Sequence, residues 1–333
     1  MNKRVMRQVV PIFLAAGLLW YVLNDVPLAQ IGSQFKKADY GLLGLVGLLI
    51  GLFYILRAAR WQLTLQAIGY KPSLFRATVA LLAGSLASMI VPGAGELTRC
   101  GTLQQTDGIP VSQGIGSVVA ERIIDLLMLV LVLLLTVILE FGRAKAYFAN
   151  LTLALPGMLL LVVGLILVLL ATVIIWQVRR RSTAQSHPLI LKFADLVSGF
   201  GRGFMAIRQL PKPGLFVSIT LLIQVFAWLT TYVLLLATDS TQQLPLTAAL
   251  TILAVSSLGG LAVPTQGGIG TYHFLVSRAL VLYGFSTAEG VSLATFMHAV
   301  GFGFNLLFSS LSFLIVPVLV QQRKQPTPLE RDA

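Results

Sequence analysis

Residues 114–139 read GIGSVVAERIIDLLMLVLVLLLTVIL, and this stretch decides the fold class of the chain. A helix of about 20 consecutive apolar residues crosses the roughly 30 Å hydrocarbon core of a bilayer. The stretch is longer than that and carries only three charged residues, Glu121, Arg122 and Asp125. It therefore predicts a transmembrane helix with a compact cluster of charges toward its beginning.

The rest of the chain has the same character. Hydrophobic residues make up 56% of the 333 residues and charged residues only 11%, whereas soluble domains average about 25% charged residues. We therefore predict an all-α integral membrane protein with six to eight transmembrane helices, folded as a single membrane domain over residues 1–333. Further segments long and apolar enough to span lie at 9–23, 40–60, 152–178, 214–237 and 291–320.

Two more apolar stretches, residues 74–91 and 246–263, run into proline and glycine. Proline lacks an N–H group and glycine adds backbone freedom, so together they stop a helix. Broken backbone at membrane depth is tolerated only where protein or a cavity surrounds it. We predict two re-entrant helical hairpins, although two full spans per pair would also fit. The predicted tips contain Pro92, Gly93 and Gly95 in the first hairpin, and Pro264, Gly267, Gly268 and Gly270 in the second.

The two hairpin regions resemble each other. Residues 108–114 (GIPVSQG) parallel residues 284–290 (GFSTAEG) at an offset of 176. Repeats 40–140 and 214–320 each read as span, hairpin, span, and the basic loop residues give the two repeats opposite orientations with both termini cytoplasmic. This predicts an inverted repeat, a plan common among transporters. Chance similarity between glycine-rich membrane segments is the alternative.

The formal net charge of +12 comes from 24 basic and 12 acidic residues. Most basic residues lie in short loops, where they indicate topology and anionic lipid headgroups, not nucleic acid. Residues 182–213 carry apolar residues at spacings of 3 and 4, which favours a basic amphipathic helix on the inner leaflet or packed beneath the bundle. One cysteine, Cys100, excludes an internal disulfide, and the histidine spacing predicts no metal site and no cofactor.

Charged residues inside a bilayer are costly and are candidates for function. Glu121 and Asp125 share one helical face, with Arg122 in the same broad arc. They form either a functional site or an internal salt bridge. Glu96 and Arg99 follow the first break, where a helix start favours an anionic group such as phosphate; a cap made by Glu96 is the alternative.

Other candidates stand on neighbouring spans. Arg57 and Arg60 near the end of the second span would clamp a phosphate or anchor the helix at the interface. In the second repeat the candidates are His273 and His298, together with Asn305, which shares a helical face with His298. A histidine here either accepts a proton or makes a polar contact between helices. A small face formed by Gly41, Gly44, Gly47 and Gly51 indicates close helix packing within the chain or in a homo-oligomer.

The run VPGAGELTR at 91–99, the Glu121-Arg122-x-x-Asp125 motif and the glycines at 267–270 together resemble the flippase-like membrane domain of lysylphosphatidylglycerol synthases, over roughly residues 10–320. The resemblance implies a domain that translocates a lipid. In two-domain relatives a soluble domain makes that lipid, and this chain is expected to lack it. Relatives often carry Arg-Glu after the second glycine motif, where this chain has Thr271, Tyr272 and His273.

The sequence thus predicts a lipid flippase of the bacterial cytoplasmic membrane, a transporter more than an enzyme, with membrane lipid as its partner. Two other functions stay open. A membrane-embedded enzyme that modifies lipid headgroups would place acids and a histidine in a pocket open to one side. A non-catalytic partner of a lipid-synthesis enzyme would pair Glu96, Arg99, Glu121, Arg122 and Asp125 with one another and leave no cavity.

Overall fold

The computed structural model describes residues 17, 19–21, 23, 28–143, 145, 210–263 and 265–324, and the regular elements of this part are all helices. These helices are those of a membrane α-helical protein, as predicted. The elements are α2 (Leu28–Lys37), α3 (Tyr40–Ala67), α4 (Leu74–Ile90), α5 (Ala94–Asp107), α6 (Val111–Leu139), α10 (Pro213–Leu236), α11 (Leu246–Ala262), the 3-10 helix η1 (Gln266–Gly268), α12 (Thr271–Val281) and α13 (Thr287–Lys324).

Four of these helices, α3, α6, α10 and α13, are long and apolar enough to cross a membrane. They coincide with the predicted spans 40–60, 114–139, 214–237 and 291–320, and each extends beyond at least one predicted end. Predicted span 152–178 lies outside the described residues, as do most of span 9–23, most of the amphipathic segment 182–213, both chain termini and Pro264.

Local side-chain contacts explain where several helices begin. Asp39 caps α3 by accepting hydrogen bonds from the backbone N–H groups of Gly41 and Leu42, at 2.8 and 3.1 Å. Ser286 and Glu289 form a reciprocal capping box at the start of α13, with Ser286 N donating to Glu289 Oε2 and Glu289 N donating to Ser286 Oγ. These caps satisfy N–H groups that the first helical turn leaves unpaired.

The helices break where the sequence predicts. Gly93, between α4 and α5, has φ +82°, and three glycines around η1 also have positive φ. A side chain in this left-handed region is strained, so glycine suits these turns. Helices α4 and α5 pack against each other, as do α11 and α12, so each break joins two arms of a helical hairpin. The re-entrant position of these hairpins in a membrane stays a prediction.

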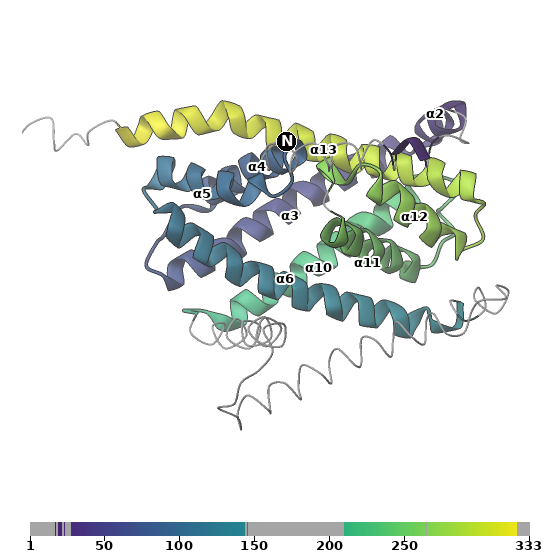
Figure 1. The fold of residues 1–333 in the computed structure, drawn as a ribbon, viewed down its shortest axis with the longest axis horizontal. Coiled ribbons are helices and arrows are strands. Elements are labelled where there is room, and N and C mark those ends of the chain that lie inside the picture. The colour runs from purple at the N-terminus through teal and green to yellow at the C-terminus, as the bar shows by residue number, and fades with distance from the viewer. Residues whose placement is uncertain are drawn as a thin grey trace, which may run out of the picture.

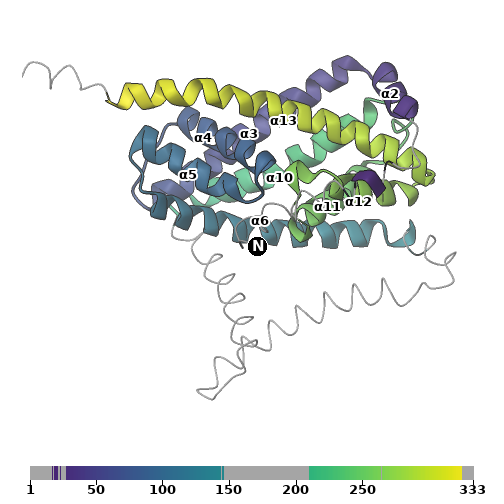
Figure 2. The same cartoon turned by 45° about the horizontal axis from the view of Figure 1, so that its top comes forward.

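The two hairpins lie toward opposite ends of the long axis, while α6 and α13 run along it on two sides (Figure 1). Arg323, near the end of α13, donates to the carbonyl of Gln105 at the end of α5. Arg143, just after α6, lies over the ring of Tyr283, just after α12. The broken tips meet between these ends, because η1 contacts α4. A view turned by 45° shows the same arrangement (Figure 2).

Paired glycines occupy matching places in the two hairpins. Gly108 and Gly284, which the offset of 176 relates, both follow a second arm with positive φ, +76° and +92°. Gly114 and Gly290, related by the same offset, both pack close to that arm: a Cβ at Gly114 would lie 2.9 Å from Cys100 Sγ, and one at Gly290 would lie 2.8 Å from the Ser277 carbonyl oxygen. The inverted repeat stays a prediction, which these features support.

The predicted small face of α3 packs inside the chain over part of its length. Gly47 and Gly51 face Phe304 and Phe308 of α13, and a Cβ at Gly47 would overlap the Phe304 ring. A Cβ at Gly44 would meet no other part of the described chain within 4 Å. Close packing of α3 on α13 therefore accounts for two of the four glycines, and a homo-oligomer stays a prediction.

We expect Gly84→Ala to destabilise the first hairpin. A Cβ at Gly84 would lie 2.6 Å from the backbone oxygen of Gly95, so α4 and α5 would have to separate. Overpacking of this kind costs about 1–3 kcal/mol. Gly101→Ala is the control, because nothing lies within 4 Å of its Cβ and alanine favours a helix. Thermal unfolding in detergent should show a loss for Gly84→Ala only; equal melting temperatures would contradict the close backbone contact.

Candidate functional site

Six charged side chains of the first repeat form one closed ring of ion pairs, which we call the ion ring. Arginine and acid alternate around it, so each guanidinium contacts two carboxylates and each carboxylate contacts two guanidinium groups. The six pairs are Arg60–Glu121 (3.4 Å), Glu121–Arg99 (3.1 Å), Arg99–Glu96 (2.7 Å), Glu96–Arg122 (3.4 Å), Arg122–Asp125 (3.2 Å) and Asp125–Arg60 (2.6 Å).

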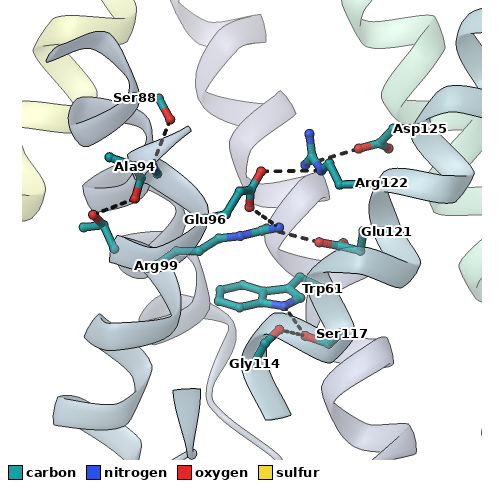
Figure 3. A network of polar contacts seen from close by, with 12 residues as sticks. Trp61, Ser88, Ala94, Glu96, Arg99, Gly114, Ser117, Glu121, Arg122 and Asp125 are labelled. Atoms are coloured by element: carbon teal, nitrogen blue, oxygen red, sulfur yellow. Dashed lines mark hydrogen bonds and ion pairs between the residues drawn. The ribbon is translucent and has the colours of Figure 1, made fainter. Parts of the chain in front are cut away.

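Helical spacing positions the members of the ring on three helices. Glu121 and Asp125 of α6 are four apart and both face Arg60 of α3. On α5, Glu96 and Arg99 are three apart and pair with each other. The ring thus fastens α5 and α3 to α6, and Figure 3 shows the side chains of α5 and α6 pointing toward one another.

The ring has a buried side, which we call the dry side, and a solvent-exposed side, which we call the open side. The side chains of Arg60, Arg99 and Glu121 are at most 3% exposed, whereas those of Asp125, Glu96 and Arg122 are 30, 39 and 44% exposed. On the dry side each charge depends on its partners, because an unpaired buried charge is strongly destabilising. On the open side the carboxylate and guanidinium groups can reach another polar molecule.

An aromatic contact fixes Arg99 in place. Its guanidinium lies over the Trp61 ring, 4.6 Å from the centroid, a geometry in which the ring attracts the cation. The Trp61 Nε1–H donates to Ser117 Oγ at 2.9 Å, and Ser117 in turn donates to the carbonyl of Gly114 at 2.7 Å. The sequence did not mark Trp61 as a site residue; its only signal was a large amphipathic ring next to an arginine in an apolar helix.

A cavity of about 200 Å³, the arginine cavity, opens beside the ring and is lined by Glu96, Arg99 and Arg122 together with Arg57. Arg57 makes no ion pair among the described residues; its guanidinium lies 5.7 Å from the Phe53 ring. The three arginines and three acids of the ring cancel. Arg57 therefore leaves the arginine cavity with an excess of one positive charge within the described part of the chain.

A second cavity of about 250 Å³, the histidine cavity, lies at the tip of the second hairpin and is lined by Gly267, His298, Asn305 and Tyr272, among others. His298 Nε2 lies 2.9 Å from the Gly267 carbonyl oxygen, and His273 Nδ1 accepts a hydrogen bond from Gly270 N at 3.3 Å. The two imidazole rings are 4.8 Å apart. Both histidines thus contact the backbone of the tip, and His298 also faces the cavity.

The structure contradicts two of the alternatives that the sequence left open. Arg60 is not an interfacial anchor, because it is 1% exposed and pairs with two acids. Glu96 does not cap α5: the helix has no side-chain cap, and Ser88 Oγ accepts the bond from Gly95 N at 3.1 Å. The structure brings Arg57, Glu96, Arg99 and Arg122 to one cavity.

The chain matches a known protein family over most of its length. Residues 8–309 match the family described as Lysylphosphatidylglycerol synthase TM region. No curated protein and no solved structure matches the chain. The matched range covers most of the chain and includes the ion ring and both cavities.

Proposed function

The chain belongs to the lysylphosphatidylglycerol synthase transmembrane-region family, and on that premise we propose that it translocates a lipid with an anionic phosphate headgroup between the leaflets of the bacterial cytoplasmic membrane. The family indicates a membrane protein involved in lipid modification or translocation.

The observation that carries the proposal is the unpaired Arg57 beside a ring of balanced charges. Arg57 lies close enough to Asp125 for their charges to interact, but Asp125 is already paired with Arg60 and Arg122. A positive charge in excess is costly in a medium of low polarity. A lipid phosphate would neutralise it and accept charge-assisted hydrogen bonds, which guanidinium groups form well with phosphate. Arg122 and Glu96 on the open side of the ring would contact the remaining polar atoms of the headgroup.

The placement of the two cavities supports passage across the membrane. The arginine cavity lies in the first repeat, and the histidine cavity lies at the tip of the second hairpin. Opposed broken helices that meet near the midplane are a common basis for alternating access in transporters. The opposed hairpins and the matching glycines support an inverted repeat of this kind. The acyl chains would remain in lipid outside the helices.

A non-catalytic role predicts that the charged residues pair with one another and leave no cavity. The pairing is present in the ion ring, but Glu96, Arg99 and Arg122 also line the arginine cavity. This cavity favours a bound substrate over a purely structural network.

The test is translocation of fluorescent lipids by the purified protein in proteoliposomes. An anionic phosphatidylglycerol analogue, a zwitterionic phosphatidylcholine analogue and a neutral glycolipid are compared with protein-free liposomes, with and without a proton gradient. We expect the anionic lipid to move about tenfold faster than the other two, which corresponds to an activation free energy lower by about 1.4 kcal/mol. Rates equal to those of protein-free liposomes for every lipid would contradict the proposal. A change in the mass of the lipid would favour the headgroup-modifying enzyme.

A further inference from the structure

The two cavities share a polar wall. Ser85 of α4 lines the arginine cavity, and Asn305 of α13 lines the histidine cavity. Ser85 Oγ donates to Asn305 Oδ1 at 2.8 Å. One direct hydrogen bond therefore connects a residue of the first cavity to a residue of the second.

Tyr54 of α3 completes this wall. Its hydroxyl lies 2.7 Å from Ser85 Oγ and donates to Asn305 Oδ1 at 2.7 Å. The tyrosine side chain is buried, with 6% of its surface exposed. We call Tyr54, Ser85 and Asn305 the polar gate. Its members come from three different helices, so it joins the first hairpin to α3 and α13.

The hydrogen bonds of the gate can be exchanged. Asn305 Oδ1 has a third hydroxyl within reach, Ser309 Oγ at 3.1 Å, yet a carbonyl oxygen has only two lone pairs. Tyr54 and Ser85 can also bond to each other, with either as donor. A polar atom of a passing headgroup could therefore replace one partner without leaving a buried hydroxyl unpaired, which would be costly.

Resting on the proposed function, we propose that Tyr54, Ser85 and Asn305 separate the two cavities at rest and that the lipid headgroup passes between them. The headgroup oxygens replace the bonds that close the gate, and the bonds re-form behind them. This assigns a specific role to three uncharged side chains. Of these, only Asn305 was a candidate from the sequence.

The first test locks the gate. In a Cys100→Ala background, which removes the single native cysteine, Ser85→Cys and Asn305→Cys are joined by a short thiol-reactive cross-linker that a reductant can release. We expect the cross-linked protein to translocate an anionic lipid at least about tenfold more slowly. This corresponds to an activation barrier raised by about 1.4 kcal/mol or more. Reduction should restore the rate.

The matched control uses the pair Asn305→Cys and Ser309→Cys. These residues are four apart on α13, so the same cross-linker bridges them within one helix and leaves α4 free. The cross-linked control should translocate the lipid at the same rate as its own reduced form, because the cross-link does not join α13 to α4. If the cross-linked Ser85→Cys, Asn305→Cys protein translocates as fast as its reduced form, the headgroup does not pass between these residues. That result would contradict the proposed gate.

A second test does not depend on translocation, so it separates failure of the gate from failure of the flippase proposal. Single cysteines at Ser88→Cys and Thr230→Cys report on the arginine and histidine cavities. A membrane-impermeant thiol reagent should label each from one side only. Tyr54→Phe combined with Asn305→Ala should allow labelling from both sides. The gate is contradicted if the parent protein is labelled from both sides, or if the double substitution leaves the sidedness unchanged.

Discussion

Glu121→Gln is expected to destabilise the folded protein by about 3–5 kcal/mol, the usual cost of removing one partner from a buried ion pair. Glu121 contacts two guanidinium groups, those of Arg60 and Arg99, and all three side chains are at most 3% exposed. A glutamine amide cannot balance either charge, and the ring then carries a buried excess of positive charge. Thermal unfolding in detergent, followed by tryptophan fluorescence, measures the loss.

Asp107→Asn is the matched control for Glu121→Gln, because it removes the same charge from an ion pair at a helix end. Asp107 pairs with Arg76 at 3.3 Å, and the two side chains are 12% and 29% exposed. Pairs in contact with solvent contribute about 0–1 kcal/mol, so this variant should unfold close to the wild-type temperature. Similar losses in both variants would contradict the central structural role of the ion ring.

Arg57→Gln is expected to have the opposite pattern: normal stability and a loss of anionic lipid binding of about tenfold or more. Arg57 has no ion pair in the described residues that its removal would break. Hydrogen bonds to charged groups contribute about 1.5–3 kcal/mol. A ligand that binds the folded state raises the melting temperature, so titration with an anionic lipid should stabilise the wild type much more than Arg57→Gln.

Arg278→Gln provides a control with matched geometry. The Arg278 guanidinium lies 5.7 Å from the Phe274 ring, as that of Arg57 does from Phe53, but Arg278 lines neither cavity. Its removal should leave lipid-dependent stabilisation unchanged, and Arg57→Lys should retain a larger part of it than Arg57→Gln. Equal losses in Arg57→Gln and Arg278→Gln would indicate a general effect of surface charge.

The sequence predicted those features that depend on neighbours along the chain. A helix places residues three and four positions apart on one face, so the shared face of Glu121 and Asp125 could be read directly. The helix breaks at Gly93 and Gly267 followed from residues that disrupt helices. The four described spans followed from length and apolarity.

The features that the sequence did not predict depend on which helices become neighbours. Arg60 and Glu121 are 61 positions apart, and no local pattern distinguishes an arginine in an ion ring from one at an interface. Tyr54 and Ser85 are uncharged residues in apolar helices, so their bonds to Asn305, 251 and 220 positions away, have no sequence signal. Closure of the ring and of the gate arises only from tertiary packing.

The most direct test of the proposed function is the rate at which proteoliposomes translocate a fluorescent phosphatidylglycerol analogue, measured for the wild type beside Arg57→Gln. The wild type should move this lipid about tenfold faster than a phosphatidylcholine analogue, and Arg57→Gln should remove most of that preference while the protein remains folded. A folded wild-type protein that moves neither lipid, or an Arg57→Gln variant that keeps the full preference, would contradict translocation of an anionic headgroup through the arginine cavity.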